Sequence, residues 1–188
     1  MKLQLNALLI VFALVNLFTI NNVKAQTANP KTYSVEQIIE KAPTLVGQTV
    51  QVQGRVSHVC KTTGRKLFLE TADEKKTFRI NAGKNITKYS QSLIDSIVVA
   101  TGVVAETRIT LDDLKKQEAK AIEAEKTKKA AEHCTSEAKA NGEDTQATPL
   151  QRIQVQIETI KKQVAEGKNG YLSFYTVDDC NTYKTIKE

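Results

Sequence analysis

Residues 49–71, TVQVQGRVSHVCKTTGRKLFLET, decide the predicted fold. They indicate two strands around a basic turn at Lys61–Arg65, because apolar and polar residues alternate on both sides of that turn. Successive side chains of a strand point to opposite faces. The apolar face of the first strand is therefore predicted to hold Val50, Val52, Gly54, Val56, His58 and Cys60. On this pattern a histidine and a cysteine end the core face, just before the turn.

Three further strands follow from similar patterns. Residues 77–80 extend the first two strands into a meander, and residues 96–109 form the longest β-type run. Gly102 interrupts that run and Gly54 holds a similar place in the first strand, and a glycine inside a strand often marks a bulge or a bend. Two long strands that each bend at a glycine favour a small closed barrel. Residues 171–177, YLSFYTV, supply its last strand, and Asp178–Asp179 after it are expected to form a turn.

A short helix is predicted ahead of the barrel, from Tyr33 to Ala42. Ser34 and Gln37 match a capping box at its start, and Pro43 is expected to end it. Residues 84–95, between the third and fourth strands, indicate a helix or an irregular connection.

A helical hairpin is predicted before the last strand. Residues 112–140 are dense in Lys, Glu and Ala, which favours one long helix with a thin apolar stripe, used either as a solvated spacer or as a docking arm for a partner. A second helix is indicated from Thr148, with Pro149 at its first position, to Gly167. Its apolar residues are spaced three or four apart, so it is expected to pack on another element.

This order of elements resembles an OB-fold, a five-stranded barrel with a helix between the third and fourth strands. The resemblance lies in VGQTVQVQGRVSHV and IVVATGVV, and in the turn His58–Lys66, HVCKTTGRK, which is similar to small exported bacterial OB-fold proteins of uncharacterised role. The predicted fold class is thus mainly β with α: an OB-fold-type barrel over residues 33–188, with residues 111–167 as a helical insertion.

The resemblance implies a ligand site on the face of the second and third strands and on the loop at Lys61–Arg65. OB-folds bind single-stranded nucleic acid through cationic grooves with stacking side chains. The candidate ligand-binding residues are Arg55, Lys61, Arg65, Lys66, Phe68, Arg79 and Tyr175. The aromatic residues Phe68 and Tyr175 are expected on exposed faces, as are Arg55 and Arg79.

Residues 1–25 have the layout of a secretory signal peptide: a lysine at position 2, an apolar run, and Val23 and Ala25 at the −3 and −1 positions of a cleavage site. An exported protein, periplasmic or extracellular, is therefore expected, with no transmembrane segment after cleavage. The alternative is an uncleaved N-terminal anchor.

Composition argues against nucleic acid as the main partner. Loss of Lys2 and Lys24 with the leader lowers the formal charge from +6 to +4, and the chain has no Trp, five Tyr and five Phe. A mild charge and few aromatic residues, on an exported chain, leave single-stranded nucleic acid or another polyanion as the weaker interpretation.

Three cysteines allow two different chemistries. In an oxidising compartment two of Cys60, Cys134 and Cys180 are expected to pair, and a Cys60–Cys134 disulfide would fasten the insertion to the barrel. The alternative is a metal or thiol-redox site, because both histidines lie within two residues of a cysteine and imidazole with thiolate binds zinc or copper. Its ligands would be His58, Cys60, His133 and Cys134.

No motif for catalysis is recognisable: the sequence lacks a phosphate-binding glycine loop, a nucleophile motif and a carboxylate pair. The function predicted from sequence is a non-enzymatic extracytoplasmic binding module, without a cofactor, for an unidentified ligand or envelope protein. Metal binding or thiol chemistry at His58 and Cys60 is the runner-up.

Overall fold

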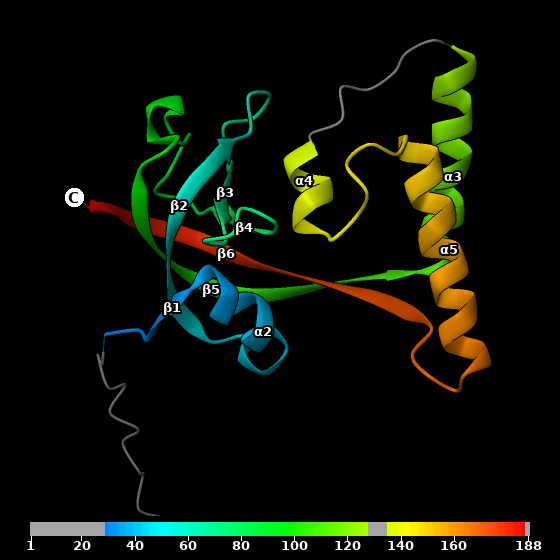
Figure 1. The fold of residues 1–188 in the computed structure, drawn as a ribbon, viewed down its shortest axis with the longest axis horizontal. Helices are drawn as coiled ribbons and strands as arrows, with labels where there is room; N and C mark the ends of the chain where they lie inside the picture. The colour runs from blue at the N-terminus through cyan, green and yellow to red at the C-terminus, as the bar shows by residue number, and fades with distance from the viewer. Residues whose placement is uncertain (1–28, 128–134, 187–188) are drawn as a thin grey trace, which may run out of the picture.

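Five strands close into a barrel in the computed structural model, which describes residues 29–127 and 135–186 (Figure 1). The order around the barrel is β2–β3–β4–β6–β5, and β5 pairs again with β2; only the β4–β6 pairing in this circle is parallel. The predicted OB-fold-type barrel is therefore confirmed. A three-residue strand, β1 (Thr32–Ser34), which the sequence did not predict, pairs with β2 in parallel outside the barrel. The barrel strands are β2 (Thr49–Val59), β3 (Lys66–Glu70), β4 (Thr77–Ala82), β5 (Ile97–Thr110) and β6 (Tyr171–Ile186).

A bulge in β2 changes which side chains face the core. Val56 pairs with Leu69 and His58 with Phe68, so Ser57 is the extra residue of β2 at this point. Such an insertion reverses the alternation beyond it. Val59 is consequently fully buried, while His58 lies on the outer face with its ring 5.6 Å from that of Phe68. The prediction that His58 and Cys60 end the core face was wrong.

The last strand is longer than predicted. β6 continues to Ile186 instead of ending at Val177, and the predicted turn at Asp178–Asp179 is a bulge within it, where Asp179 has φ of +50°. The strand β5 passes close to this bulge at Gly102, where a Cβ atom would lie 2.5 Å from the Asp178 carbonyl oxygen. Glycine is thus required at position 102, as its place in the strand pattern suggested.

One helix and one irregular connection complete the barrel. α2 (Val35–Leu45) begins with the predicted capping box at Ser34 and contributes buried residues to the barrel core. It runs two residues past Pro43, because a proline in the last turn removes only one backbone hydrogen bond of the helix. The connection from β4 to β5 is irregular apart from one turn of 3-10 helix, η1 (Gln91–Leu93).

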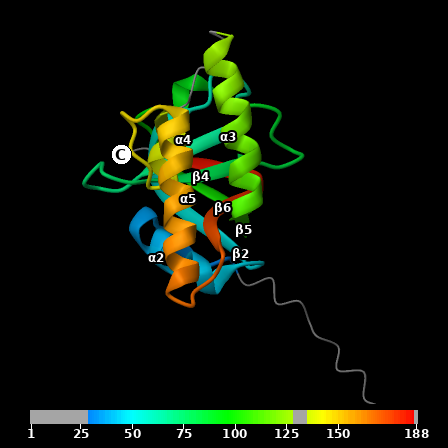
Figure 2. The same ribbon diagram turned by 90° about the vertical axis from the view of Figure 1, so that its right-hand side faces the viewer.

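The insertion lies between β5 and β6, as predicted. The two strands extend beyond the barrel as a ribbon that ends in a hairpin of α3 (Leu111–Lys126) and α5 (Pro149–Ala165), which lie side by side (Figures 1 and 2). Leu114, Ile157 and Ile160 form a small second core there.

The single long helix predicted over residues 112–140 was wrong. α3 ends at Lys126, and a separate six-residue helix, α4 (Thr135–Ala140), lies against β4 of the barrel (Figure 1). The insertion therefore contacts the protein in two places, at the end of the ribbon and on the barrel wall. Among the helices that the structure describes, none is long and apolar enough to cross a membrane. The predicted signal peptide lies outside the described residues.

Candidate functional site

The outer face of β3 and β4 is covered by α4. Phe68 lies between Leu67 and Leu69, whose side chains enter the barrel core, so its own ring points outward. The ring is nevertheless fully buried, and Arg79, its register partner on β4, is bound to a residue of α4. The expectation that Phe68 lies on an exposed face was therefore wrong. We call Lys66, Phe68 and Arg79 the covered face.

Glu137 of α4 binds both cations of the covered face. Lys66 Nζ donates to the two carboxylate oxygens at 2.9 and 2.6 Å, and Arg79 Nη1 donates to one of them. Burial of Glu137 opposes its ionisation, but the hydrogen bond and charge of Lys66, together with Arg79, outweigh burial and lower the pKa of this carboxyl. Arg79 Nε is buried and has no hydrogen-bond partner among the described residues. Two cations of the covered face thus share the single carboxylate of Glu137.

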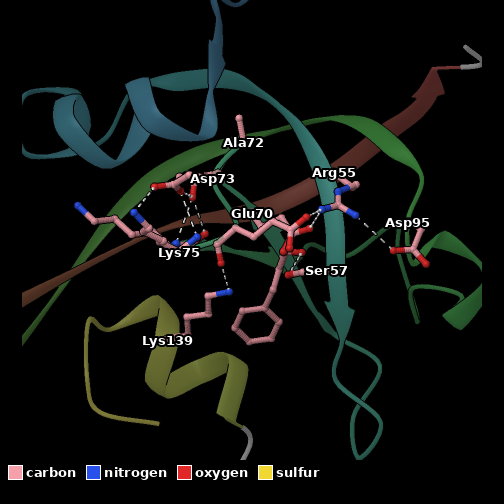
Figure 3. A network of polar contacts seen from close by, with 12 residues as sticks. Arg55, Ser57, Glu70, Ala72, Asp73, Lys75, Asp95 and Lys139 are labelled. Carbon is pink, nitrogen blue, oxygen red and sulfur yellow. Dashed lines mark hydrogen bonds and ion pairs between the residues drawn. The ribbon is translucent and has the colours of Figure 1, made fainter.

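Three smaller contacts complete the attachment of α4. Ala138 is fully buried, the Thr77 hydroxyl donates to the Ser136 carbonyl at 3.3 Å, and Lys139 Nζ donates to the Glu74 carbonyl. Figure 3 shows Lys139 extending from α4 towards the turn between β3 and β4. α4 thus combines apolar burial, at Ala138 and over Phe68, with ion pairs and hydrogen bonds of Glu137, Ser136 and Lys139.

The other four predicted ligand residues do not join the covered face. Arg55 lies between carboxylates, 2.7 Å from Glu70 and 3.8 Å from Asp95, and also pairs with Glu74 (Figure 3). Its positive charge is therefore already compensated within the barrel.

Arg65, Lys61 and Tyr175 lie at three different places. Arg65 donates to backbone carbonyls of the loop after β4, at 2.7 Å to Ala82 and 3.1 Å to Ile86, and so fixes that loop. Lys61 is exposed at the turn. Tyr175 packs against the barrel core and its hydroxyl donates to Glu106 at 3.4 Å.

The structure does not support the predicted disulfide. Cys60 and Cys180 both carry free thiols, and Cys134 and His133 lie outside the described residues. Burial opposes ionisation of Cys60, but hydrogen bonds from Thr63 and Thr62 outweigh it and lower the pKa of this thiol. Burial raises the pKa of the Cys180 thiol.

Of the four predicted metal ligands, the structure describes His58 and Cys60. Residues 29–127 and 135–186 contain no group of three or more His, Cys, Asp or Glu side chains placed to hold a metal ion. The pKa of His58 is lowered by burial and by the charge of Lys61, which favours the neutral imidazole.

The structure contains a cavity of about 710 Å³ at a place where the sequence predicted no site. It lies between α5, the loop of residues 141–147 and the first residues of β6. Arg152 of α5, only 6% exposed, closes one wall: its Nε lies 3.4 Å from Glu143 Oε2 and its Nη1 donates to the Asp144 carbonyl at 3.1 Å. Gln156 and Asn141 donate to the same Glu143 carboxylate at 2.7 and 3.1 Å. The one available signal was an arginine within the apolar pattern of the second predicted helix.

Comparison with known proteins gives no family. No protein-family model matches the chain, and no curated protein sequence matches it. Among solved structures the chain is similar to a putative aspartyl-tRNA synthetase from Leishmania major Friedlin, with 20% identity and a TM-score of 0.30, over 45% of this chain and 17% of that one. It is also similar to aspartyl tRNA synthetase from Entamoeba histolytica, with 17% identity and a TM-score of 0.34, over 74% and 36% respectively. The chain therefore matches about a third or less of these longer proteins.

Proposed function

We propose that this protein is a non-enzymatic, extracytoplasmic binding module that holds an anionic group of its ligand or partner protein on the covered face. The observation that supports this proposal is the convergence of Lys66 and Arg79, from adjacent strands, on the single carboxylate of Glu137. A lysine beside an arginine is a common way to bind carboxylate or phosphate, because charge-assisted hydrogen bonds are short and strong.

In this proposal Glu137 occupies the place of the ligand's anion. α4 is six residues long and its Glu137 pairs with both Lys66 and Arg79, so an external anion that pairs with these two cations competes with α4 directly. Displacement of α4 also uncovers Phe68 for stacking or apolar contact. The apparent affinity is then the intrinsic affinity reduced by the fraction of molecules in which α4 is released.

A charge-neutral substitution in α4 tests this proposal. Glu137→Gln keeps the size of the side chain but removes its charge, and should strengthen binding of a labelled twelve-residue oligoglutamate roughly tenfold at low salt, which corresponds to about 1.4 kcal/mol of lost competition. Glu166→Gln is the matched control, because Glu166 lies in the hairpin and pairs with Lys168 there.

Two further measurements decide the outcome. Arg79→Gln should abolish the gain seen with Glu137→Gln, since one of the two proposed anion contacts is removed. Equal binding by the wild type, Glu137→Gln and Glu166→Gln proteins would refute the proposal. A twelve-nucleotide oligothymidine, measured beside the oligoglutamate over a salt series, distinguishes a nucleic-acid ligand from an acidic protein segment.

Thiol or metal chemistry at Cys60 is the second candidate, favoured by the lowered pKa of its thiol. In that case elemental analysis of the native protein should find about one metal ion per protein chain, or mass spectrometry without reductant should find the Cys60 thiol modified. A metal-free protein with an unmodified Cys60 would contradict it.

A further inference from the structure

The cavity beside α5 is lined by the edge of a strand. Four consecutive residues of β6, from Tyr171 to Phe174, line it. Successive side chains point to opposite faces of a strand, so four neighbours in sequence share one cavity only if the cavity runs along the strand's edge. We call this cavity, bounded by residues 171–174, α5 and the loop 141–147, the β6 groove.

The backbone of this edge is open to pairing. Residues 171–174 pair with β5 on their other edge, and β4 joins β6 only from Val177 onward. With its amide nitrogen turned towards the strand, Gln163 donates to the Tyr171 carbonyl at 3.3 Å and to the Asn169 carbonyl at 3.2 Å. No other hydrogen bond to the groove side of residues 171–174 is present among the described residues. An unpaired row of N–H and C=O groups is a template for one more strand.

Gln163 also indicates which residues face the groove. The N–H and C=O groups of one residue leave a strand on the same side, and those of the next residue leave it on the other. Since the Tyr171 carbonyl points towards α5, the backbone groups of Ser173 face the same side. An added chain therefore meets alternate donors and acceptors along this stretch.

Among the charged residues that line the β6 groove, Asp144 is the one for which no ion pair is found in the described part of the chain. Arg152 is paired with Glu143, and Lys168 is paired with Glu166. The Asp144 carboxylate accepts from the backbone N–H of Gln146 at 2.8 Å. An acidic occupant would meet the unpaired Asp144 carboxylate, so charge complementarity favours an occupant without acidic groups.

The opposite wall offers apolar contact. Val155 of α5 lines the groove and is 67% exposed, and Leu172 and Phe174 of β6 line it from the other side. The volume of the groove lies within the range of small-ligand sites, and its open strand edge selects an extended main chain over a compact molecule.

We propose that the β6 groove binds an extended peptide segment that has no acidic residues and belongs to a partner protein, and that this segment adds as a strand beside residues 171–174. The main-chain hydrogen bonds of the edge bind the peptide backbone, and the apolar groups around Val155 determine the specificity for its alternate side chains. This site lies between the insertion and the first residues of β6 and shares no residue with the covered face, so it neither requires nor excludes the anion site proposed above.

Selection from a library of random seven-residue peptides displayed on phage, with the full protein as target, provides the probe. Enriched peptides should lack acidic residues in their central positions. Synthetic copies should bind the wild type and lose affinity by about tenfold or more with Val155→Arg, which places a long cation across the groove. Gln154→Arg is the matched control, because Gln154 is an exposed neighbour on α5 outside the groove and adds the same charge.

Backbone pairing has its own test. Methylation of alternate peptide amides removes main-chain donors without changing the side chains, and one of the two alternating sets should weaken binding far more than the other. The proposal is refuted if no peptide is enriched, if Val155→Arg and Gln154→Arg bind alike, or if both methylated sets bind as the parent peptide does. It is also refuted if Val155→Arg dissolves a dimer of the wild-type chain, since the occupant would then be a second copy.

Discussion

The ion pair between Glu137 and Arg79 should contribute measurably to stability, in contrast to pairs on the open surface. We consider the double-mutant cycle of Glu137→Gln and Arg79→Gln. The two side chains are 25% and 17% exposed, so the pair lies between a fully exposed pair, about 0.2–1 kcal/mol, and a buried one, about 3–5 kcal/mol when one partner is removed. After discounting for solvent screening, a coupling of about 1–2 kcal/mol is expected.

Urea unfolding followed by circular dichroism measures the free energies of the four proteins in this cycle. The control cycle uses Lys161 and Glu158, whose side chains are 54% and 70% exposed at a separation of 2.8 Å on α5. The control pair should couple several times more weakly than the first pair, even though the charged atoms of both pairs are within hydrogen-bond distance. Equal couplings in both cycles would show that α4 does not shield the covered face from water, and the reasoning on Glu137 would fail.

Three other outcomes follow from the structure. Gly102→Ala should lower the free energy of unfolding by about 3 kcal/mol, because the added Cβ would lie 2.5 Å from a carbonyl oxygen of β6. Gly170→Ala, where the atom nearest to the added Cβ lies at 3.5 Å, should be tolerated, and thermal unfolding compares the two variants. The Glu137 pKa is lowered from its ordinary 4.5, so the stability from this carboxylate is fully present above about pH 4.5 and is lost as pH falls through the lower folded value; urea unfolding should show a smaller loss for Glu137→Gln over that window. Iodoacetamide at neutral pH should modify Cys60 well before Cys180, because the second thiol is buried and its pKa is raised; peptide mass spectrometry reads both sites.

Local patterns were enough to predict the barrel but not its irregularities. The alternation of apolar residues in β2 and the glycine at position 102 predicted closure correctly, since both are local signals of strands and bends. The bulge at Ser57 has no such signal, and it moved His58 from the predicted core face to the outer face. The predicted last strand was too short because Asp178 and Asp179 resemble a turn in sequence, although they form a bulge inside β6.

The candidate site depended on contacts between residues far apart in the chain. Lys66 and Arg79 were identified as cations on one face, but nothing in their neighbourhood indicated that Glu137, 71 and 58 residues away, would bind them. Phe68 was expected to be exposed for the same reason: the helix that buries it belongs to the insertion. The β6 groove needs three segments to come together, and no single one of them carries a recognisable motif.

The position of the insertion also sets the order in which the barrel forms. β6 joins β4 across a long stretch of chain: Asn81 donates to Asp178 at 2.6 Å, with 97 positions between them. Such distant pairings form late and slowly, because the entropy cost of closing a long loop comes before the stabilisation from the contact. While the polypeptide is being synthesised, β2 to β5 are therefore expected to form an open sheet with two unpaired edges until the sixteen residues of β6 are available. The barrel core is completed only when the carboxyl-terminal segment arrives.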